Sequence, residues 1–307
     1  MARAVAAPDS MTAGFSLPPF RFVDTHVHLF DHAVEGLAWE FHDQDWEHPR
    51  LKGAFRLDAP KYSVPQFRTE VRAHGVVKMV HVQAVKLGRD RVAETRWLQD
   101  VADAHGWPNA IIGPAVLADA SAQSDVERQA AFANFRGVRD RSDPARIGTP
   151  EFDRGIEALE AVGGLCELMI TLDDYTAAIA VARRHPRATF VLEHAGLPVV
   201  SRTDAYFAQW REAVRRVAQV DNVVCKVSAL SSAAPHTFFA DSIRRWVLGC
   251  IDAFGVERCM FASNWPIDKL FVTYGELLAA FVEIVEECTP SEQEALFATN
   301  AERVYRI

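Results

Sequence analysis

Two histidines near the start of the chain have the spacing of a reactive pair. His26 and His28 lie in the run "RFVDTHVHL" (21 to 29), whose apolar residues are typical of a buried strand. Side chains alternate across a strand, so residues two apart point to the same face. Two imidazoles on one face can bind a metal ion or act as an acid and a base. The alternative is a pair of hydrogen-bonded structural histidines.

Three further polar residues have positions that fit catalysis. His194 comes at the end of "ATFVLEHA" (188 to 195), before a Gly-Leu-Pro turn, and Asn264 ends "RCMFASN" (258 to 264). His236 lies in the loop sequence "SSAAPHTFF", where it is either a catalytic or an exposed loop residue. Zinc sites need three or four ligands, and His26, His28 and His194 could supply three, with Glu167 as a fourth. Zinc is therefore a candidate cofactor.

Other polar residues within apolar runs are candidates for binding a substrate. Charged or amide side chains in a strand need a partner, which can be another residue or a ligand. We expect Lys226 and Glu167 to bind each other or a substrate anion, and an arginine at 139 to offer a planar fork to a carboxylate or lactone carbonyl. His81 and Arg136 are weaker candidates than their neighbours. The candidate substrate-binding residues are Gln83, Arg139, Glu167, Lys226 and Trp265.

Short apolar runs alternate with amphipathic helical patterns along the whole chain. This alternation is typical of a parallel sheet with crossover helices. Eight strands are expected, at 21 to 29, 76 to 84, 110 to 117, 135 to 140, 164 to 170, 188 to 195, 222 to 230 and 258 to 264. That number closes a (β/α)8 TIM barrel, in which catalytic groups lie at the C-terminal ends of the strands. A doubly wound open sheet is the alternative architecture.

Composition limits the kinds of partner. The chain has 307 residues and a formal net charge of -8, without a long Lys/Arg cluster, which argues against nucleic acid or an anionic membrane. A small-molecule substrate or a second copy of the chain remains. The five cysteines show no zinc-ribbon spacing, so we expect reduced packing thiols in a cytoplasmic protein. No run of 18 apolar residues occurs, so we expect no segment that spans a membrane.

The domain organisation expected is a flexible tail over residues 1–20 followed by one barrel domain over residues 21–307. The tail lacks the continuous apolar core of a secretory signal. Residues 30–66 form an aromatic, histidine-containing stretch without clean periodicity. A connection of that length in a compact domain is typical of a lid or binding loop.

Seven motifs in order resemble the amidohydrolase-related branch of the amidohydrolase superfamily. They are "VDTHVHLFD", "VHVQA", "FRGVRD", "FVLEHAGLP", "NVVCKVSAL", "CMFASNWPID" and "TNAERVYRI". The branch includes sugar-acid lactonases of the fuconolactonase type and, more distantly, 2-pyrone-4,6-dicarboxylate lactonase. The resemblance implies a distorted, metallo-dependent-hydrolase-like TIM barrel in which a metal is optional. It also implies that His26, His28 and His194 match family histidines, and that Arg139, with Arg136 second, matches substrate-binding arginines.

One position departs from the family pattern. The lactonases usually carry Asp in the sequence SDWP as the base that activates water, whereas this chain has Asn264 in SNWP. An amide cannot accept a proton at neutral pH, although it can orient a water molecule. Asp268 follows four residues later, and we expect it to brace Lys269 or a helix start rather than to replace that base.

Three hypotheses follow for function. The first is a hydrolase that opens a lactone or related cyclic ester of a small oxygen-rich acid, with His194 or His236 as base and Asn264 positioning the water. The second is a lyase or decarboxylase of the same superfamily, which needs no water base. The third is a barrel that has lost its catalytic base and binds or regulates instead.

Overall fold

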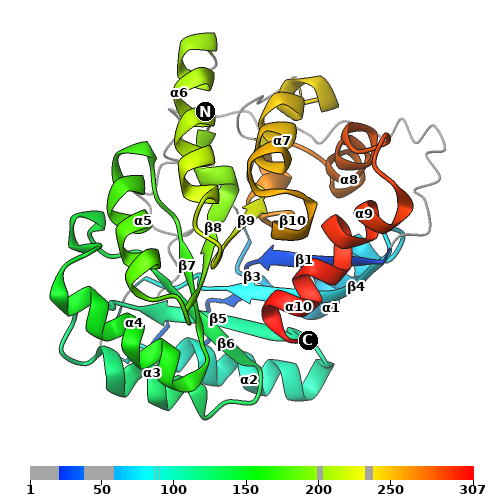
Figure 1. The fold of residues 1–307 in the computed structure, drawn as a ribbon. Coiled ribbons are helices and arrows are strands. Elements are labelled where there is room, and N and C mark those ends of the chain that lie inside the picture. The colour runs from blue at the N-terminus through cyan, green and yellow to red at the C-terminus, as the bar shows by residue number, and fades with distance from the viewer. Residues whose placement is uncertain (1–20, 38–58, 87, 89, 199–202, 232–237) are drawn as a thin grey trace, which may run out of the picture.

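Eight parallel strands form the centre of the molecule, and a helix follows each of them (Figure 1). The computed structural model describes residues 21–37, 59–86, 88, 90–198, 203–231 and 238–307. The strands, in their order around the sheet, are β1 (Phe22–Val27), β4 (Val76–Val82), β5 (Ala110–Ala115), β6 (Phe135–Asp140), β7 (Leu165–Leu168), β8 (Thr189–Leu192), β9 (Val223–Val227) and β10 (Cys259–Phe261).

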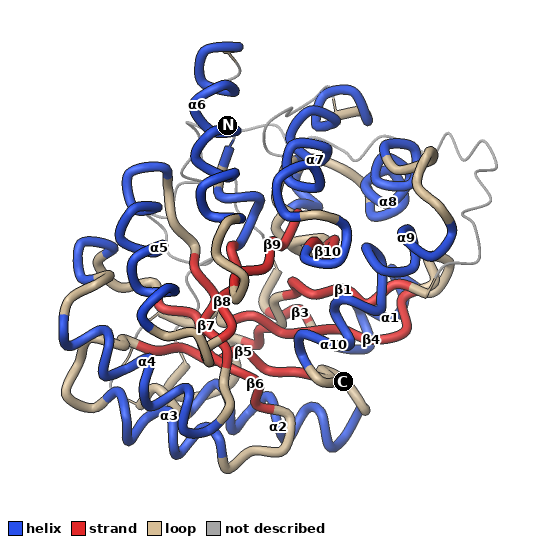
Figure 2. The backbone as a smooth tube through the Cα atoms, in the orientation of Figure 1, coloured by secondary structure: helices blue, strands red, loops and turns tan. Residues whose placement is uncertain are grey.

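The helices surround the strands, as Figure 2 shows in blue and red. The helices that follow the barrel strands are α1 (Val64–Val71), α2 (Ala93–His105), α3 (Ala122–Ala130), α4 (Pro150–Val162), α5 (Tyr175–Arg184), α6 (Asp204–Ala218), α7 (Ala240–Phe254) and α8 (Tyr274–Ile284). Near the C-terminus, α9 (Pro290–Glu294), a π-helical turn (Ala295–Thr299) and α10 (Asn300–Tyr305) complete the described chain. The predicted (β/α)8 barrel is thereby confirmed.

The barrel closes between its first and last strands, near their C-terminal ends. Val27 and Trp265 form a parallel bridge, in which the backbone N–H of His28 donates to Trp265 O at 2.8 Å and that of Trp265 donates to His26 O at 3.2 Å. The irregular pairing of β1 between Asp24 and Val27 precedes this bridge. The closure therefore brings the two histidines of β1 beside the loop that follows β10.

Helix ends follow local sequence signals. The Thr149 hydroxyl accepts from Phe152 N at the start of α4, and Gly163 ends that helix in the left-handed conformation. At the start of α8, Thr273 and Glu276 form a reciprocal capping box. These caps fix where each helix begins relative to the strand before it.

The barrel interior is apolar toward the N-terminal ends of the strands. A buried cluster contains Val23, Val80, Val82, Ala110, Ile112, Leu165, Val191, Val224 and Met260 from the strands, with Ala298, Ala301, Val304 and Tyr305 from the C-terminal segment. Glu302 in α10 pairs with Lys78 at 2.7 Å, and Arg136 Nε donates to Tyr305 O at 2.8 Å, both near strand starts. Helix α10 thus covers the N-terminal end of the barrel.

The remaining sequence expectations concern the N-terminal tail, the irregular stretch at residues 30–66, the cysteines and membrane-spanning segments. The expected tail, residues 1–20, and residues 38–58 of the irregular stretch lie outside the described residues. The described ends of that stretch form an antiparallel pair, β2 (Phe30–Asp31) and β3 (Lys61–Tyr62). All five cysteines are described, and each is a free thiol. In the described chain, the helices are too short or too polar to cross a membrane.

Candidate active site

A layer of charged side chains lies above the apolar layer of the barrel. Arg139, Glu167, Glu193 and Lys226 each come two residues after Gly137, Leu165, Val191 and Val224 respectively, and all four are at most 2% exposed. Because side chains two apart share a face of a strand, the charges follow the inward-facing residues toward the C-terminal ends. Two cations and two carboxylates can balance one another, which buried charges require.

Lys226 and Glu167 bind each other. This is one of the two alternatives predicted from the sequence, the other being a substrate anion. The Lys226 Nζ atom lies 2.8 and 2.7 Å from the two oxygens of Glu167, and the Tyr305 hydroxyl donates to Glu167 Oε1 at 2.6 Å. Burial raises the pKa of the Glu167 carboxyl, and the Lys226 ammonium opposes that rise. The pair joins the charged layer to α10 through Tyr305.

Arg139 holds protein groups in this structure. Its Nη1 donates to Glu193 Oε2 at 3.2 Å, its Nε donates to Gln83 Oε1 at 3.0 Å, and its Nη2 donates to Gln83 O. Three of the five N–H groups of a guanidinium are used in this way. Gln83 and Arg139 are therefore brought together, and the role of either in substrate binding stays a prediction.

The three predicted histidines meet at the mouth. The ring centroid of His26 lies 4.8 Å from that of His28 and 4.5 Å from that of His194. His28 Nδ1 bonds to Val82 O at 2.8 Å, whereas both ring nitrogens of His26 are buried without a hydrogen-bond partner. Burial, with repulsion from neighbouring cationic groups, lowers the pKa of His26 and of His28 well below the usual range.

A strained turn directs His194 inward. Strand β8 ends at Leu192, and His194, Ala195 and Leu197 all have positive φ, at 56°, 53° and 53°. An extended chain would send His194 to the face opposite Glu193, and the left-handed turn removes that alternation. His194 Nδ1 lies 2.9 Å from Ser228 Oγ, which orients the ring.

Glu193 is the functional candidate that sequence reasoning missed. Its Oε1 lies 3.9 Å from His26 Nδ1, and its Oε2 lies 3.8 Å from His194 Nε2. Burial alone would raise the pKa of this carboxyl, but Arg139 and the other cationic neighbours hold it well below the usual range. The signal was present: Glu193 is a carboxylate within the apolar run at 188 to 195, and a charge that interrupts an apolar strand is the signal that identified Glu167.

One group of three in the described part of the chain has the donor atoms of a metal site. It comprises His26, Glu193 and His194, whose ligand atoms lie within 4.8 Å of one another. The unpartnered nitrogens of His26 and the unpartnered Oε1 of Glu193 fit such a site, because buried polar atoms normally have a partner. His28 is outside this group, so the metal set predicted from sequence differs from it by one ligand.

Asn264 lies at the mouth with Asp268 behind it. The Asn264 Nδ2 donates to Asp268 Oδ1 at 2.7 Å, and the Ser231 hydroxyl donates to Asp268 Oδ2 at 2.5 Å. The expectation that Asp268 braces Lys269 is wrong, because Lys269 Nζ pairs with Glu70 at 2.6 Å. A short 3-10 turn does begin at Asp268, but its side chain does not cap that turn.

Asp24 joins the first and last strands beneath these residues. Its Oδ1 accepts from the backbone N–H of Ser263 at 3.0 Å and of His26 at 3.3 Å. Its Oδ2 accepts from the hydroxyls of Ser263 at 2.6 Å and Tyr274 at 2.8 Å. One buried carboxylate thus fixes the backbone beside both His26 and Asn264.

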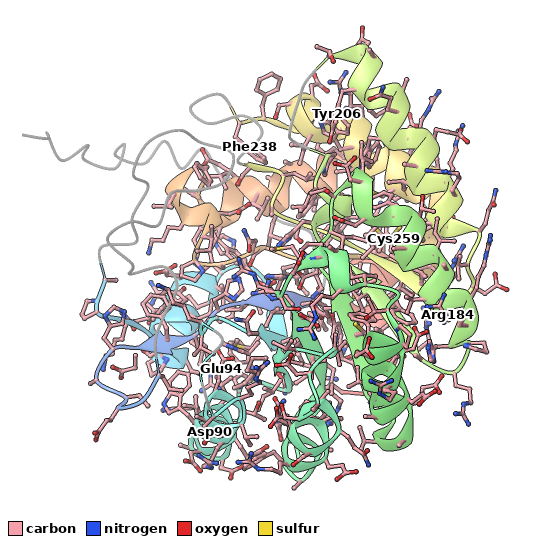
Figure 3. All side chains as sticks on the ribbon, turned by 90° about the vertical axis from the view of Figure 1, so that its left-hand side faces the viewer. Asp90, Glu94, Arg184, Tyr206, Phe238 and Cys259 are labelled. Atoms are coloured by element: carbon pink, nitrogen blue, oxygen red, sulfur yellow. The ribbon has the colours of Figure 1, made fainter. Side chains whose placement is uncertain are left out.

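His81 faces the helix layer rather than the mouth. Its Nδ1 accepts from Leu29 N at 3.1 Å, so the proton is on Nε2, which lies 3.3 Å from Glu94 Oε1. Glu94, labelled in Figure 3, also accepts from Ala84 N and Val85 N and so organises the loop after β4. Arg136 is likewise away from the mouth, since it binds Tyr305 O at the opposite end of the barrel.

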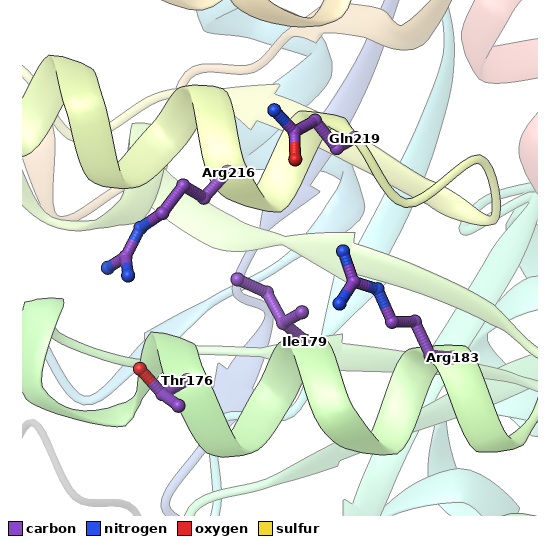
Figure 4. Close-up of a pocket in the computed structure, with 5 residues that line it drawn as sticks. All are labelled: Thr176, Ile179, Arg183, Arg216 and Gln219. Atoms are coloured by element: carbon purple, nitrogen blue, oxygen red, sulfur yellow. The ribbon is translucent and has the colours of Figure 1, made fainter.

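Trp265 and His236 are the two remaining residues predicted to belong to the site. Trp265 is 2% exposed, and its indole N–H donates to Glu70 Oε2 at 2.7 Å. Its role in substrate binding stays a prediction. His236 lies outside the described residues. A pocket between α5 and α6, lined by Thr176, Ile179, Arg183, Arg216 and Gln219, contains none of the predicted site residues (Figure 4).

The fold and the buried histidines at the strand ends define a TIM-barrel enzyme. The sequence model described as amidohydrolase matches residues 23–307, and the chain belongs to this family. The match extends over nearly all of the described barrel, which agrees with the resemblance inferred from the ordered motifs.

Individual relatives cover almost the whole chain. An uncharacterized protein of Sinorhizobium fredii, y4mH, is 32% identical over 93% of this chain and 98% of its own length. The L-fucono-1,5-lactonase of Burkholderia ambifaria is 28% identical over 93% of this chain and 95% of its own length. A crystal structure of a Burkholderia multivorans amidohydrolase with bound zinc is 27% identical, covers 94% of this chain and 99% of its own, and has a TM-score of 0.79.

Proposed function

We propose that this enzyme opens a lactone or a related cyclic ester of a small, oxygen-rich acid at the mouth of the barrel. The observation that carries the proposal is the convergence of His26 and His194 on the buried carboxylate of Glu193. Together, these two histidines and the Glu193 carboxylate can activate water without a carboxylate at position 264. The similarity to L-fucono-1,5-lactonase supports a lactone as the substrate.

His194 is the proposed general base. Ser228 at 2.9 Å from Nδ1 orients the ring so that Nε2 can take a proton from water. Glu193 Oε2, at 3.8 Å from Nε2, stabilises the positive charge that the ring gains in this step. Arg139 positions Glu193, so its proposed task is to orient the carboxylate rather than to hold the substrate directly.

Asn264 is the proposed residue that orients the attacking water. Its amide nitrogen donates to Asp268, and its carbonyl oxygen is then the atom that can accept a hydrogen bond from water. After proton transfer to His194, hydroxide attacks the lactone carbonyl, the ring C–O bond breaks, and His194 returns the proton to the leaving oxygen. The predicted alternative base, His236, lies outside the described residues and stays a prediction.

The same donor set has the chemistry of a zinc site. His26, Glu193 and His194 would hold the ion, and the donor types are those that zinc binds in catalytic sites. His194 would then be a ligand instead of the general base, so the two roles of this residue are alternatives. When bound, zinc supplies Lewis-acid polarisation of a carbonyl. We expect zinc titration by calorimetry to show loss of binding in His26→Ala and Glu193→Gln, and retention in His28→Ala. Equal loss in His28→Ala would instead favour the set of three histidines.

A substrate panel tests the proposed function. Purified protein should release acid from sugar-acid lactones and release no carbon dioxide from aromatic or unsaturated acids, which a decarboxylase would do. We expect His194→Ala to lower kcat/KM by about 100-fold or more, as loss of a general base does. His105→Ala, an exposed histidine at the end of α2, is the matched control. Equal activity of the two variants would refute the assignment.

A further inference from the structure

The amide at position 264 has a buried carboxylate as its partner. Asn264 is 7% exposed and Asp268 is 1% exposed, and their side chains meet at 2.7 Å between Nδ2 and Oδ1. The backbone reinforces the contact, because Asp268 N donates to Asn264 O at 3.2 Å. Asn264 also has a φ of 60°, a conformation that asparagine adopts more readily than most residues.

The Asp268 carboxylate determines the orientation of the Asn264 side-chain amide. An ionised carboxylate only accepts hydrogen bonds, so the nitrogen of Asn264 must face it and the carbonyl oxygen must face elsewhere. Ser231, which is fully buried, donates to the second oxygen of Asp268 and holds that carboxylate in place. The chain Ser231, Asp268 and Asn264 therefore has one consistent set of donors and acceptors.

We infer that Asp268 is a positioning residue that orients the Asn264 amide, and that positions 264 and 268 work as one carboxylate–amide pair. The inference rests on the proposed function, in which the Asn264 carbonyl oxygen orients water. It gives Asp268 a task that neither a brace for Lys269 nor a helix cap would have. It also means that residue 264 cannot be changed without regard to residue 268.

The single substitution Asn264→Asp is therefore not a simple restoration of a base. It would place two carboxylates at about hydrogen-bond distance in a buried site, where only one can ionise and the pair retains a proton. The double substitution Asn264→Asp with Asp268→Asn keeps one carboxylate and one amide. In that variant the amide nitrogen at position 268 can donate to the carboxylate at position 264, while the amide oxygen accepts from the Ser231 hydroxyl.

Kinetics of three variants test the pair. On a lactone that the wild type opens, we expect Asn264→Asp to lower kcat/KM by about 10-fold or more and Asp268→Asn to lower kcat with KM little changed. The double variant should recover to within about 10-fold of wild type, which is strongly non-additive. Additive losses, or an Asn264→Asp variant as active as wild type, would overturn the inference.

Thermal unfolding tests the same pair without any substrate. In Asn264→Asp the retained proton raises a carboxyl pKa in the folded state above its unfolded value, so its stabilising contribution is lost as pH rises through the folded pKa. We expect the melting temperature of this variant to fall below that of wild type by a gap that widens from about pH 5 to about pH 8. The double variant should show no such widening. A pH-independent gap in Asn264→Asp would overturn the pair even if no lactone is a substrate.

Discussion

Four buried charges in this barrel are arranged as two pairs of opposite sign. Lys226 and Glu167 are both fully buried, at 2.7 Å between Nζ and Oε2, and Arg139 binds Glu193 at 3.2 Å. The four side chains carry formal charges that cancel. Removing one member of a buried pair leaves its partner uncompensated, which costs far more than removing both.

Substitutions at the Lys226–Glu167 pair test this balance. We expect Lys226→Met to destabilise the fold by about 3–5 kcal/mol, because it leaves the Glu167 carboxylate buried without its cation. The double variant Lys226→Met with Glu167→Gln should lose much less, since no charge is left unpaired. Unfolding in guanidinium chloride measures both free energies. Equal destabilisation of the single and double variants would contradict this account.

Polar residues that interrupt apolar strands in the sequence are buried inside the barrel in the structure, and their functional roles stay predictions. His26, His28, Glu167 and Lys226 were identified because charged or imidazole groups in apolar runs are informative in any barrel. Glu193 was missed because strand alternation would place it on the face opposite His194, which was predicted to lie at the mouth. Only the left-handed backbone at His194, with a φ of 56°, brings both side chains to the same site.

The turn after β8 is the element that makes this arrangement possible. Side chains of the two neighbouring helices donate hydrogen bonds to its backbone carbonyl groups. The Tyr175 hydroxyl of α5 donates to Gly196 O at 2.7 Å, and the Trp210 indole N–H of α6 donates to Ala195 O at 2.9 Å. Gly196 has a φ of +67°, and an added Cβ would lie 1.6 Å from the Tyr175 hydroxyl oxygen. A side chain at position 196 therefore requires Tyr175 to move.

Two glycine substitutions separate backbone strain from packing at this turn. Gly163, which ends α4, has a similar φ of +65° but nothing within 4 Å of an added Cβ. We expect Gly163→Ala to cost about 1 kcal/mol, the usual penalty of a left-handed alanine. Gly196→Ala should cost about 1–3 kcal/mol more, because Tyr175 must move and lose its hydrogen bond. Denaturant unfolding measures the difference, and equal costs would show that the turn adapts freely.

Strand positions were predicted well and strand ends less well. All eight expected strands are present, but the expected strand at 188 to 195 ends at Leu192 and that at 258 to 264 ends at Phe261. In each case the polar residues that were assigned to the strand belong to the turn that follows. Apolar periodicity identifies a buried strand, whereas the backbone of a catalytic turn depends on contacts with other elements that no local pattern contains.

The molecule is closed at both ends of the barrel by different devices. At the mouth, the bridge between Val27 and Trp265 joins β1 to the chain after β10. At the other end, Tyr305 of α10 enters the apolar layer and reaches Glu167 with its hydroxyl group. The C-terminal helix therefore contributes to the same charged layer that lies beneath the histidines.

Two tyrosine substitutions test this contribution of the C-terminal helix. Tyr305→Phe removes a buried hydrogen bond to a carboxylate, and we expect it to cost about 1.5–3 kcal/mol. Tyr175→Phe removes a buried hydrogen bond to a neutral carbonyl and should cost about 0.5–1.5 kcal/mol. Urea unfolding of both proteins gives the comparison. A Tyr305→Phe variant as stable as wild type would show that α10 does not secure the charged layer.

Replacement of the buried carboxylate at position 193 tests the proposed site most directly. The substitution Glu193→Gln keeps the shape of the side chain but removes the charge that stabilises protonated His194. We expect kcat/KM for lactone opening to fall by about 100-fold or more, while Glu151→Gln, an exposed glutamate in α4, leaves it unchanged. Circular dichroism should show that both variants are folded. A folded Glu193→Gln protein with wild-type turnover would contradict the account.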